Sequence, residues 1–187
     1  MFQRTRDYAK DYEKIGSIAH YRGKYFRFTI EQPALKRRKA AFVLCLAFAL
    51  VFFAFIGFSD SPALGAGGHA SAIYVILPYV ALLLPLGLGF ARALLLAFKS
   101  APLEYAEYDK YIVQQKPVLL VSLILSFVLL VGELAFAFFG GEEIGTQIMP
   151  LIEAALCSAC IFTAFRQYHT LFQSIAIDEN KSVRYDI

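Results

Sequence analysis

Two acidic residues lie inside long apolar stretches of the sequence: Glu133 near the end of one stretch and Glu153 near the start of the next, so that in a helical hairpin both lie at a similar depth. An ionised carboxylate is costly in hydrocarbon, so such residues face a protein interior or water, and they often carry a proton or a cation. If the two side chains approach each other, they form a proton-binding pair or a cation site. Alternatively, each carboxyl group makes a structural hydrogen bond across a helix interface or contacts a partner protein, with Tyr74, Tyr79 and Ser126 as candidate partners within the chain.

A second candidate for chemistry is the CxxC motif formed by Cys157 and Cys160. Its spacing permits a disulfide, and membrane thiol oxidoreductases with four helices carry such a pair beside a quinone. Those enzymes also use a cysteine pair in an outward loop, whereas the third cysteine here, Cys45, lies in another apolar stretch. The motif also lies near the middle of its stretch, where access for thiol exchange is poor. Packing of small side chains at a helix interface is therefore the favoured interpretation.

Glu153, Cys157 and Cys160 share one helical face, because they are spaced by four and three residues. A soft metal needs more ligands than these, and His69 and His169 lie too far along the chain to join them. The sequence contains no glycine-rich phosphate loop, zinc-protease helix or nucleophile elbow. We therefore predict no metal site, no cofactor and no enzymatic activity of a soluble type.

Basic residues near the apolar stretches form a third group of candidates. A dense cluster precedes the first stretch, and single arginines occur near one end of the second and fourth. These side chains can anchor the topology or bind anionic lipid head groups, and we expect membrane lipids rather than nucleic acid as their partners. The candidates are Lys36, Arg37, Arg38, Lys39, Arg92 and Arg166.

The elements that must position these residues are four apolar runs, at residues 41–58, 72–98, 118–139 and 148–167. Runs of about 20 apolar residues match the thickness of a hydrocarbon core. The segments 60–71 and 140–147 contain no Lys or Arg, so they are predicted to face outward, with both termini in the cytoplasm. The predicted fold is an all-α integral membrane protein, a four-transmembrane-helix bundle in the cell membrane.

Three regions follow from these runs: a basic cytoplasmic segment at residues 1–40, a membrane domain at 41–174 and a cytoplasmic tail at 175–187. The two halves of the membrane domain share a proline after two apolar residues, Pro78 and Pro150, and an arginine further on. Two repeated helical hairpins are one explanation, and coincidence between apolar sequences is the other.

The cytoplasmic segments carry weaker patterns. Helical spacing of tyrosines predicts a surface helix over residues 4–15, and aromatic and β-branched residues favour a strand within 21–30. The tail 175–187 has two short runs about a polar turn, which suggests a hairpin. Residues 103–115 are expected to form a juxtamembrane helix that leads to Pro117.

From these features we expect a non-catalytic accessory or assembly subunit of a larger membrane complex, since helix faces and a docking surface need no motif. It would bind a protein partner in the membrane or assemble as a homo-oligomer. One alternative is a small proton- or cation-coupled transporter or channel that uses Glu133 and Glu153. The other is a membrane thiol oxidoreductase that uses Cys157 and Cys160.

Overall fold

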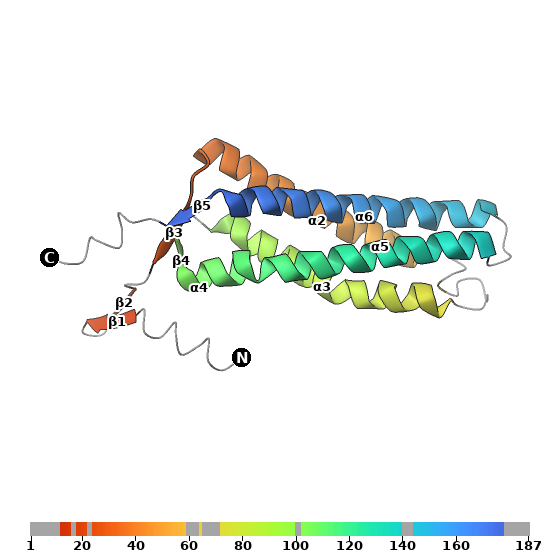
Figure 1. The fold of residues 1–187 in the computed structure, drawn as a ribbon, viewed down its shortest axis with the longest axis horizontal. Coiled ribbons are helices and arrows are strands. Elements are labelled where there is room, and N and C mark those ends of the chain that lie inside the picture. Colours follow the sequence, from red (N-terminus) through yellow and green to blue (C-terminus); the bar gives the residue numbers. More distant parts are fainter. Residues whose placement is uncertain are drawn as a thin grey trace.

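Four long helices dominate the structure, a computed structural model that describes residues 12–15, 18–21, 24–58, 64, 72–99, 102–139 and 144–177. They are α2 (Gln32–Phe58), α3 (Ile73–Phe98), α5 (Gln115–Phe139) and α6 (Ile144–Gln173), and they lie along one common direction (Figure 1). All four are long and apolar enough to cross a membrane. The prediction of four apolar helices, as in a multi-pass membrane protein, is therefore confirmed.

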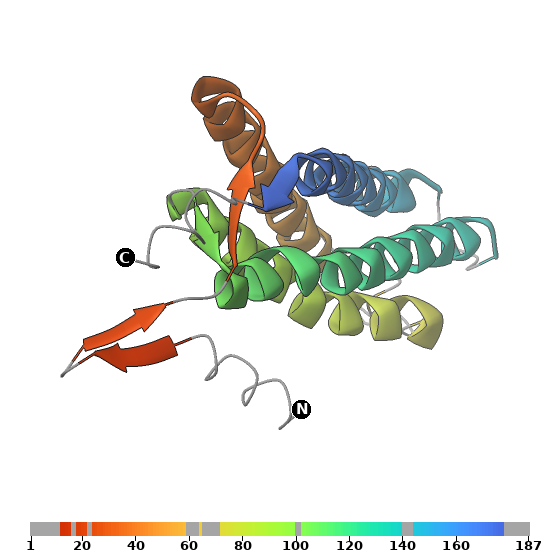
Figure 2. The same ribbon diagram turned by 60° about the vertical axis from the view of Figure 1, so that its left-hand side comes forward.

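Each long helix packs against two others. Helix α2 contacts α3 and α6, and α5 contacts the same two helices, so the four form a ring (Figure 2). Successive helices run in opposite directions along the chain (Figure 1). The result is an antiparallel four-helix bundle of up-down-up-down topology.

The bundle exposes large apolar side chains and buries some polar ones, most clearly on α5. The buried residues of helix α5 recur about every three or four positions, as on one helical face. Four of them are polar: Gln115, Ser122, Ser126 and Glu133. Its outer surface instead carries large apolar side chains, such as Phe127 and Ile124. A helix that turns polar groups inward and apolar groups outward is suited to a lipid environment.

Three of the helices begin earlier than the apolar runs predict. Helix α2 begins at Gln32 instead of 41, α5 at Gln115 instead of 118, and α6 at Ile144 instead of 148. The cluster Lys36 to Lys39 therefore lies in the first turns of α2. In α2 the added segment is rich in lysine, arginine, alanine and leucine, which have high helix propensity, so this helix readily continues past the end of its apolar segment.

A small antiparallel sheet closes one end of the bundle. Its strands are β3 (Tyr25–Phe28), β4 (Leu103–Glu104) and β5 (Ile175–Ile177), in the order β4-β3-β5. The strand expected within 21–30 is confirmed at β3. In the tail, Ile175–Ile177 pairs with β3; the second run of the expected hairpin lies in residues 178–187, outside the described residues, so the hairpin stays a prediction. The sheet joins three segments that are distant in sequence (Figure 2).

The surface helix expected over residues 4–15 is wrong for its last four residues. Tyr12–Ile15 forms strand β1, which pairs with β2 (Ile18–Tyr21) in an antiparallel hairpin. Tyrosine and isoleucine favour strands. A short isolated helix is only marginally stable, whereas the hairpin forms hydrogen bonds between its two strands. Residues 4–11 lie outside the described part of the chain.

The helix expected over residues 103–115 is present from Tyr105 onward, as α4 (Tyr105–Tyr108) followed by the π-helical turn η3 (Asp109–Val113), which leads into α5. The expectation is wrong for Leu103 and Glu104, which form strand β4. Tyr108 stacks on Phe26 of β3, with ring centroids 4.1 Å apart. The Lys99 ammonium donates a hydrogen bond to Glu107, and this bond raises the pKa of Lys99. These contacts fix the loop between α3 and α5 against the sheet.

Tyr168 fastens α6 to this turn, because its hydroxyl donates a 2.8 Å hydrogen bond to the carbonyl oxygen of Ile112. Its side chain is only 2% exposed, so Tyr168→Phe leaves a buried carbonyl without this donor. We expect a loss of about 1–2 kcal/mol in unfolding free energy, measured by denaturant titration in detergent. Tyr74→Phe, at an exposed position of α3, is the matched control. Equal stability of the two variants would contradict the role of Tyr168.

Candidate functional site

The two acidic candidates lie in the same interior. Glu133 on α5 is 1% exposed and Glu153 on α6 is 8% exposed, and these helices are neighbours in the ring. Their carboxyl groups are close enough to interact electrostatically. The structure therefore brings together the pair that the sequence singled out.

The register between α5 and α6 is marked by a hydrogen bond from the Ser158 hydroxyl to the carbonyl oxygen of Ser126, 3.0 Å long. Because the helices are antiparallel, Glu133 lies two turns beyond Ser126, at a level between Gln147 and Glu153 on α6. Gln147 is 2% exposed. We call Glu133, Gln147 and Glu153 the carboxyl cluster.

Gln147 is a residue that the sequence analysis missed. It was assigned to the outward segment 140–147, whereas the structure places it in the first turn and a half of α6, with its side chain buried. A signal was available, since Gln147 lies about one turn before Pro150, inside the same helical pattern as the apolar run that follows it. Extending the helical periodicity of the run 148–167 by one residue toward the N-terminus would have placed Gln147 on the buried face.

Hydrogen bonding within the cluster is incomplete. Among the described residues, neither oxygen of Glu133 and neither polar atom of the Gln147 amide has a hydrogen-bond partner. Burying such a group without a partner costs about 1–3 kcal/mol, and more for a charged group. A bound proton, cation or water would remove this cost.

The hydroxyl groups that the sequence suggested as partners do not bond to Glu133, which has no hydrogen-bond partner among the described residues. The Ser126 hydroxyl donates to the carbonyl oxygen of Leu123, and the Tyr79 ring stacks on Phe53 of α2 with centroids 4.5 Å apart. Tyr74 has a half-exposed side chain. A structural hydrogen bond from any of these three hydroxyls to Glu133 is therefore not formed.

Backbone oxygens add to the polar character of this region. Pro78 has no N–H group, so the carbonyl of Tyr74 lacks its ordinary helical donor. That oxygen faces Gly132, the neighbour of Glu133, and a Cβ atom added to Gly132 would lie 3.2 Å from it. In the same way, Pro150 leaves the carbonyl of Thr146, next to Gln147, without its helical donor. Carboxylate, amide and carbonyl oxygens are ligands that hard cations prefer.

The CxxC cysteines have different surroundings. The Cys157 thiol is buried and donates a 3.4 Å hydrogen bond to the carbonyl oxygen of Ala49 on α2, while Cys160 is half-buried. Both are free thiols, as is Cys45. The contact with α2 supports a packing role for Cys157 at the interface of α2 and α6.

The double variant Cys157→Ala, Cys160→Ala is expected to keep the fold and activity of the protein. A buried thiol behaves as a small apolar group, so the loss should stay near 1 kcal/mol. Alkylation with a maleimide polymer after denaturation reports the oxidation state by gel shift. An oxidised pair in the native membrane, together with loss of function in the double variant, would support the thiol oxidoreductase alternative.

The basic candidates separate into two sets. Arg92 donates to the carbonyl oxygen of Gln114 at 2.8 Å, and Lys39 donates to the carbonyl oxygen of Lys99 at 2.9 Å. These two side chains thus stabilise the connection between α3 and α5 and the start of α2. Arg37 and Arg38 instead line cavities between α2 and α6, and Arg166 lines one of these cavities.

Among the described residues, no three His, Cys, Asp or Glu side chains gather as a metal-binding group. Comparison with protein families, with curated proteins and with solved structures gives no significant match for the chain.

Proposed function

We propose that this chain is a multi-pass protein of the cell membrane in which Glu133 and Glu153 bind a proton or a small cation during coupled transport. One observation carries the proposal. The carboxyl group of Glu133 is buried in the bundle close to a second carboxyl group, and it has no hydrogen-bond partner among the described residues.

Electrostatics explains why such a pair binds a positive charge. Two ionised carboxylates close together in a medium of low dielectric constant repel each other, and each also loses its hydration. A single proton or monovalent cation between them removes most of both costs. Gln147, whose buried amide also has no described partner, is a further candidate ligand at this level of the bundle.

Exchange with water requires a change in packing, since Glu133 is almost fully enclosed. Helix α3 is suited to such a change because Pro78 and Pro85 remove two of its internal hydrogen bonds. Its first turn lies against Gly132, so a displacement of that turn would open the cluster on one side.

The orientation follows from the distribution of charge. Lys and Arg are frequent in the segments that flank the sheet end of the bundle, and the segments 60–71 and 140–147, which link α2 to α3 and α5 to α6, contain none. This bias supports an orientation with the sheet and both termini in the cytoplasm.

A reporter fused after Lys110 is therefore expected to stay in the cytoplasm. Green fluorescent protein should be bright and alkaline phosphatase inactive at this site, whereas fusion within 60–71 should give the reverse. An active phosphatase after Lys110 would contradict the topology.

Flux measurements on the reconstituted full chain test the function. A gradient of protons, sodium or potassium is imposed across the membrane of the proteoliposomes. An internal pH dye reports proton flux, and uptake measurements report sodium or potassium flux. The proposal expects a protein-dependent flux of protons or of one monovalent cation.

A non-catalytic accessory or assembly subunit is the second candidate. It is favoured by the packing of the central bundle, where the hydroxyls of Ser122, Ser126 and Ser158 all donate to backbone carbonyls. A middle section bonded in this way resembles a structural core more than an ion route. A stoichiometric partner that co-purifies in mild detergent, with assembly unaffected by Glu133→Gln, would support this candidate.

A further inference from the structure

Two adjoining cavities lie between the first turns of α2 and the last turns of α6. One has a volume of about 350 Å³ and the other about 400 Å³, and both are lined by Arg38 and Gln167. Either volume falls within the range of small-molecule sites, about 300–1,000 Å³. We call the two together the arginine groove. Its polar lining is Arg37, Arg38, Thr163, Arg166, Gln167 and Thr170.

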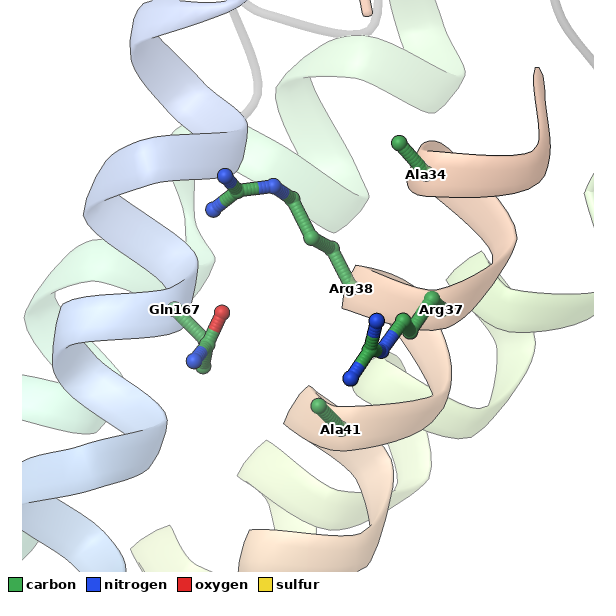
Figure 3. A pocket seen from close by; sticks show the side chains of 5 residues that line it. All are labelled: Ala34, Arg37, Arg38, Ala41 and Gln167. Carbon is green, nitrogen blue, oxygen red and sulfur yellow. The ribbon is translucent and has the colours of Figure 1, made fainter. Parts of the chain in front are cut away.

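The groove has a concentrated positive charge. Arg37 and Arg38 come from α2 and Arg166 from α6, and no acidic side chain lines either cavity. Within the part of the chain that the structure describes, none of the three guanidinium groups has a hydrogen-bond or carboxylate partner. Arg38 extends from α2 toward α6, and Gln167 points back toward α2 (Figure 3). These donors are thus available to an anion held between the helices.

We propose that the arginine groove binds a phosphate ester, with the head group of an anionic phospholipid as its source. The planar fork of arginine matches phosphate oxygens and can bind two of them at once. Basic pockets between membrane helices on the cytoplasmic side are suited to lipid head groups. The groove also has apolar walls toward the centre of the helices, at Ala41 and Phe162, against which acyl chains can pack.

The neighbouring basic cavity is less suitable for an anion. It has a volume of about 240 Å³ and is lined by Lys36, Lys39 and Lys99. The Lys39 ammonium, however, already donates to the carbonyl oxygen of Lys99 and lies 5.0 Å from the ring centroid of Phe28. Lys99 is hydrogen-bonded to Glu107. Two of the three lysines of this cavity thus already have partners within the protein, in contrast to the arginines of the arginine groove.

Native mass spectrometry of the full chain in detergent tests the proposal, with added phosphatidylglycerol or phosphatidylcholine as probes. The wild type should retain phosphatidylglycerol in preference to phosphatidylcholine. The double variant Arg38→Gln, Arg166→Gln should weaken this binding by roughly 10- to 100-fold, because it removes two charge-assisted contacts. Lys116→Gln is the matched control, since it removes an exposed positive charge at the same end of the bundle outside the groove.

Two further measurements keep the test decisive. The unfolding temperature without added lipid should be the same for the double variant and the wild type, because the replaced side chains have no described internal partner. Phosphatidylglycerol should raise it in the wild type alone. Arg38→Lys should retain only part of the affinity, since it keeps the charge and loses the fork.

The same titration with glycerol 3-phosphate and inorganic phosphate distinguishes the sources. Binding of the lipid alone supports a head-group site. Comparable binding of glycerol 3-phosphate, lost in the double variant, supports the same site with a soluble phosphate ester as its ligand. Equal losses in the double variant and in Lys116→Gln, or no binding of any phosphate probe by the wild type, would overturn the proposal. The result is independent of ion transport by the carboxyl cluster.

Discussion

Glu133→Gln is expected to reduce gradient-driven flux of protons or cations by at least about tenfold. The amide has nearly the same shape as the carboxyl group, but it can neither exchange a proton nor balance the charge of a bound cation. A tenfold loss corresponds to about 1.4 kcal/mol, which is modest for a charge interaction in a buried site. Initial rates in proteoliposomes, normalised to the amount of reconstituted protein, measure the effect.

Glu153→Gln should have a similar effect, and the double variant should be little worse than either single one. Residues that bind one ion together act as a unit, so their losses do not add. Glu31→Gln, the same chemical change at an exposed position just before α2, is the control and should transport normally. Wild-type flux in Glu133→Gln would refute the assignment, and absence of flux from the wild type would favour the accessory subunit.

Stability separates a binding role from a structural one at the same residue. If the carboxyl group formed a hydrogen bond that the fold needs, its replacement would lower the unfolding free energy of the bundle by about 1–3 kcal/mol. In the structure, however, Glu133 makes no such bond to a described residue. Glu133→Gln should therefore unfold at the same denaturant concentration as the wild type, or at a higher one.

Gly132→Leu is expected to destabilise the bundle by about 1–3 kcal/mol, the largest effect on stability that we predict from a single contact. A Cβ atom at this position would lie 3.2 Å from the backbone oxygen of Tyr74 and 3.3 Å from a methyl carbon of Val75. A backbone oxygen cannot rotate away, so the start of α3 must move from α5. Denaturant unfolding in detergent measures the loss of stability.

Gly87→Leu provides a matched control on the other helix of the same interface. No described atom lies within 4 Å of a Cβ atom added at Gly87, so leucine meets open space there. It should be neutral or stabilising, because leucine has the higher helix propensity. Gly132→Leu should also reduce flux, since the contact adjoins Glu133. Equal stability of the two leucine variants would show that α3 does not pack on α5 at Gly132.

The register between helices explains why so much of the site escaped prediction. Arg92 and Arg166 occupy corresponding places in the two halves of the sequence, yet Arg92 bonds to Gln114 while Arg166 lines a groove with Arg38. Gln147 was assigned to a loop because it lies at the edge of an apolar run. In both cases the surroundings of the side chain depend on which distant segment packs against it. A local sequence pattern does not contain that information.

By itself, the sequence determined four apolar helices, their number and approximate limits, and the concentration of basic residues at alternate connections. These are local properties, since the length of an apolar run and the charge beside it can be read without knowing what packs against them. Only the tertiary structure decided that Glu133 and Glu153 share one interior, that β5 pairs with β3, and that arginines from α2 and α6 line one groove. Such relations arise from contacts between distant segments, such as Gly132 against Tyr74 and Ser158 against Ser126, and these contacts set the register of the helices.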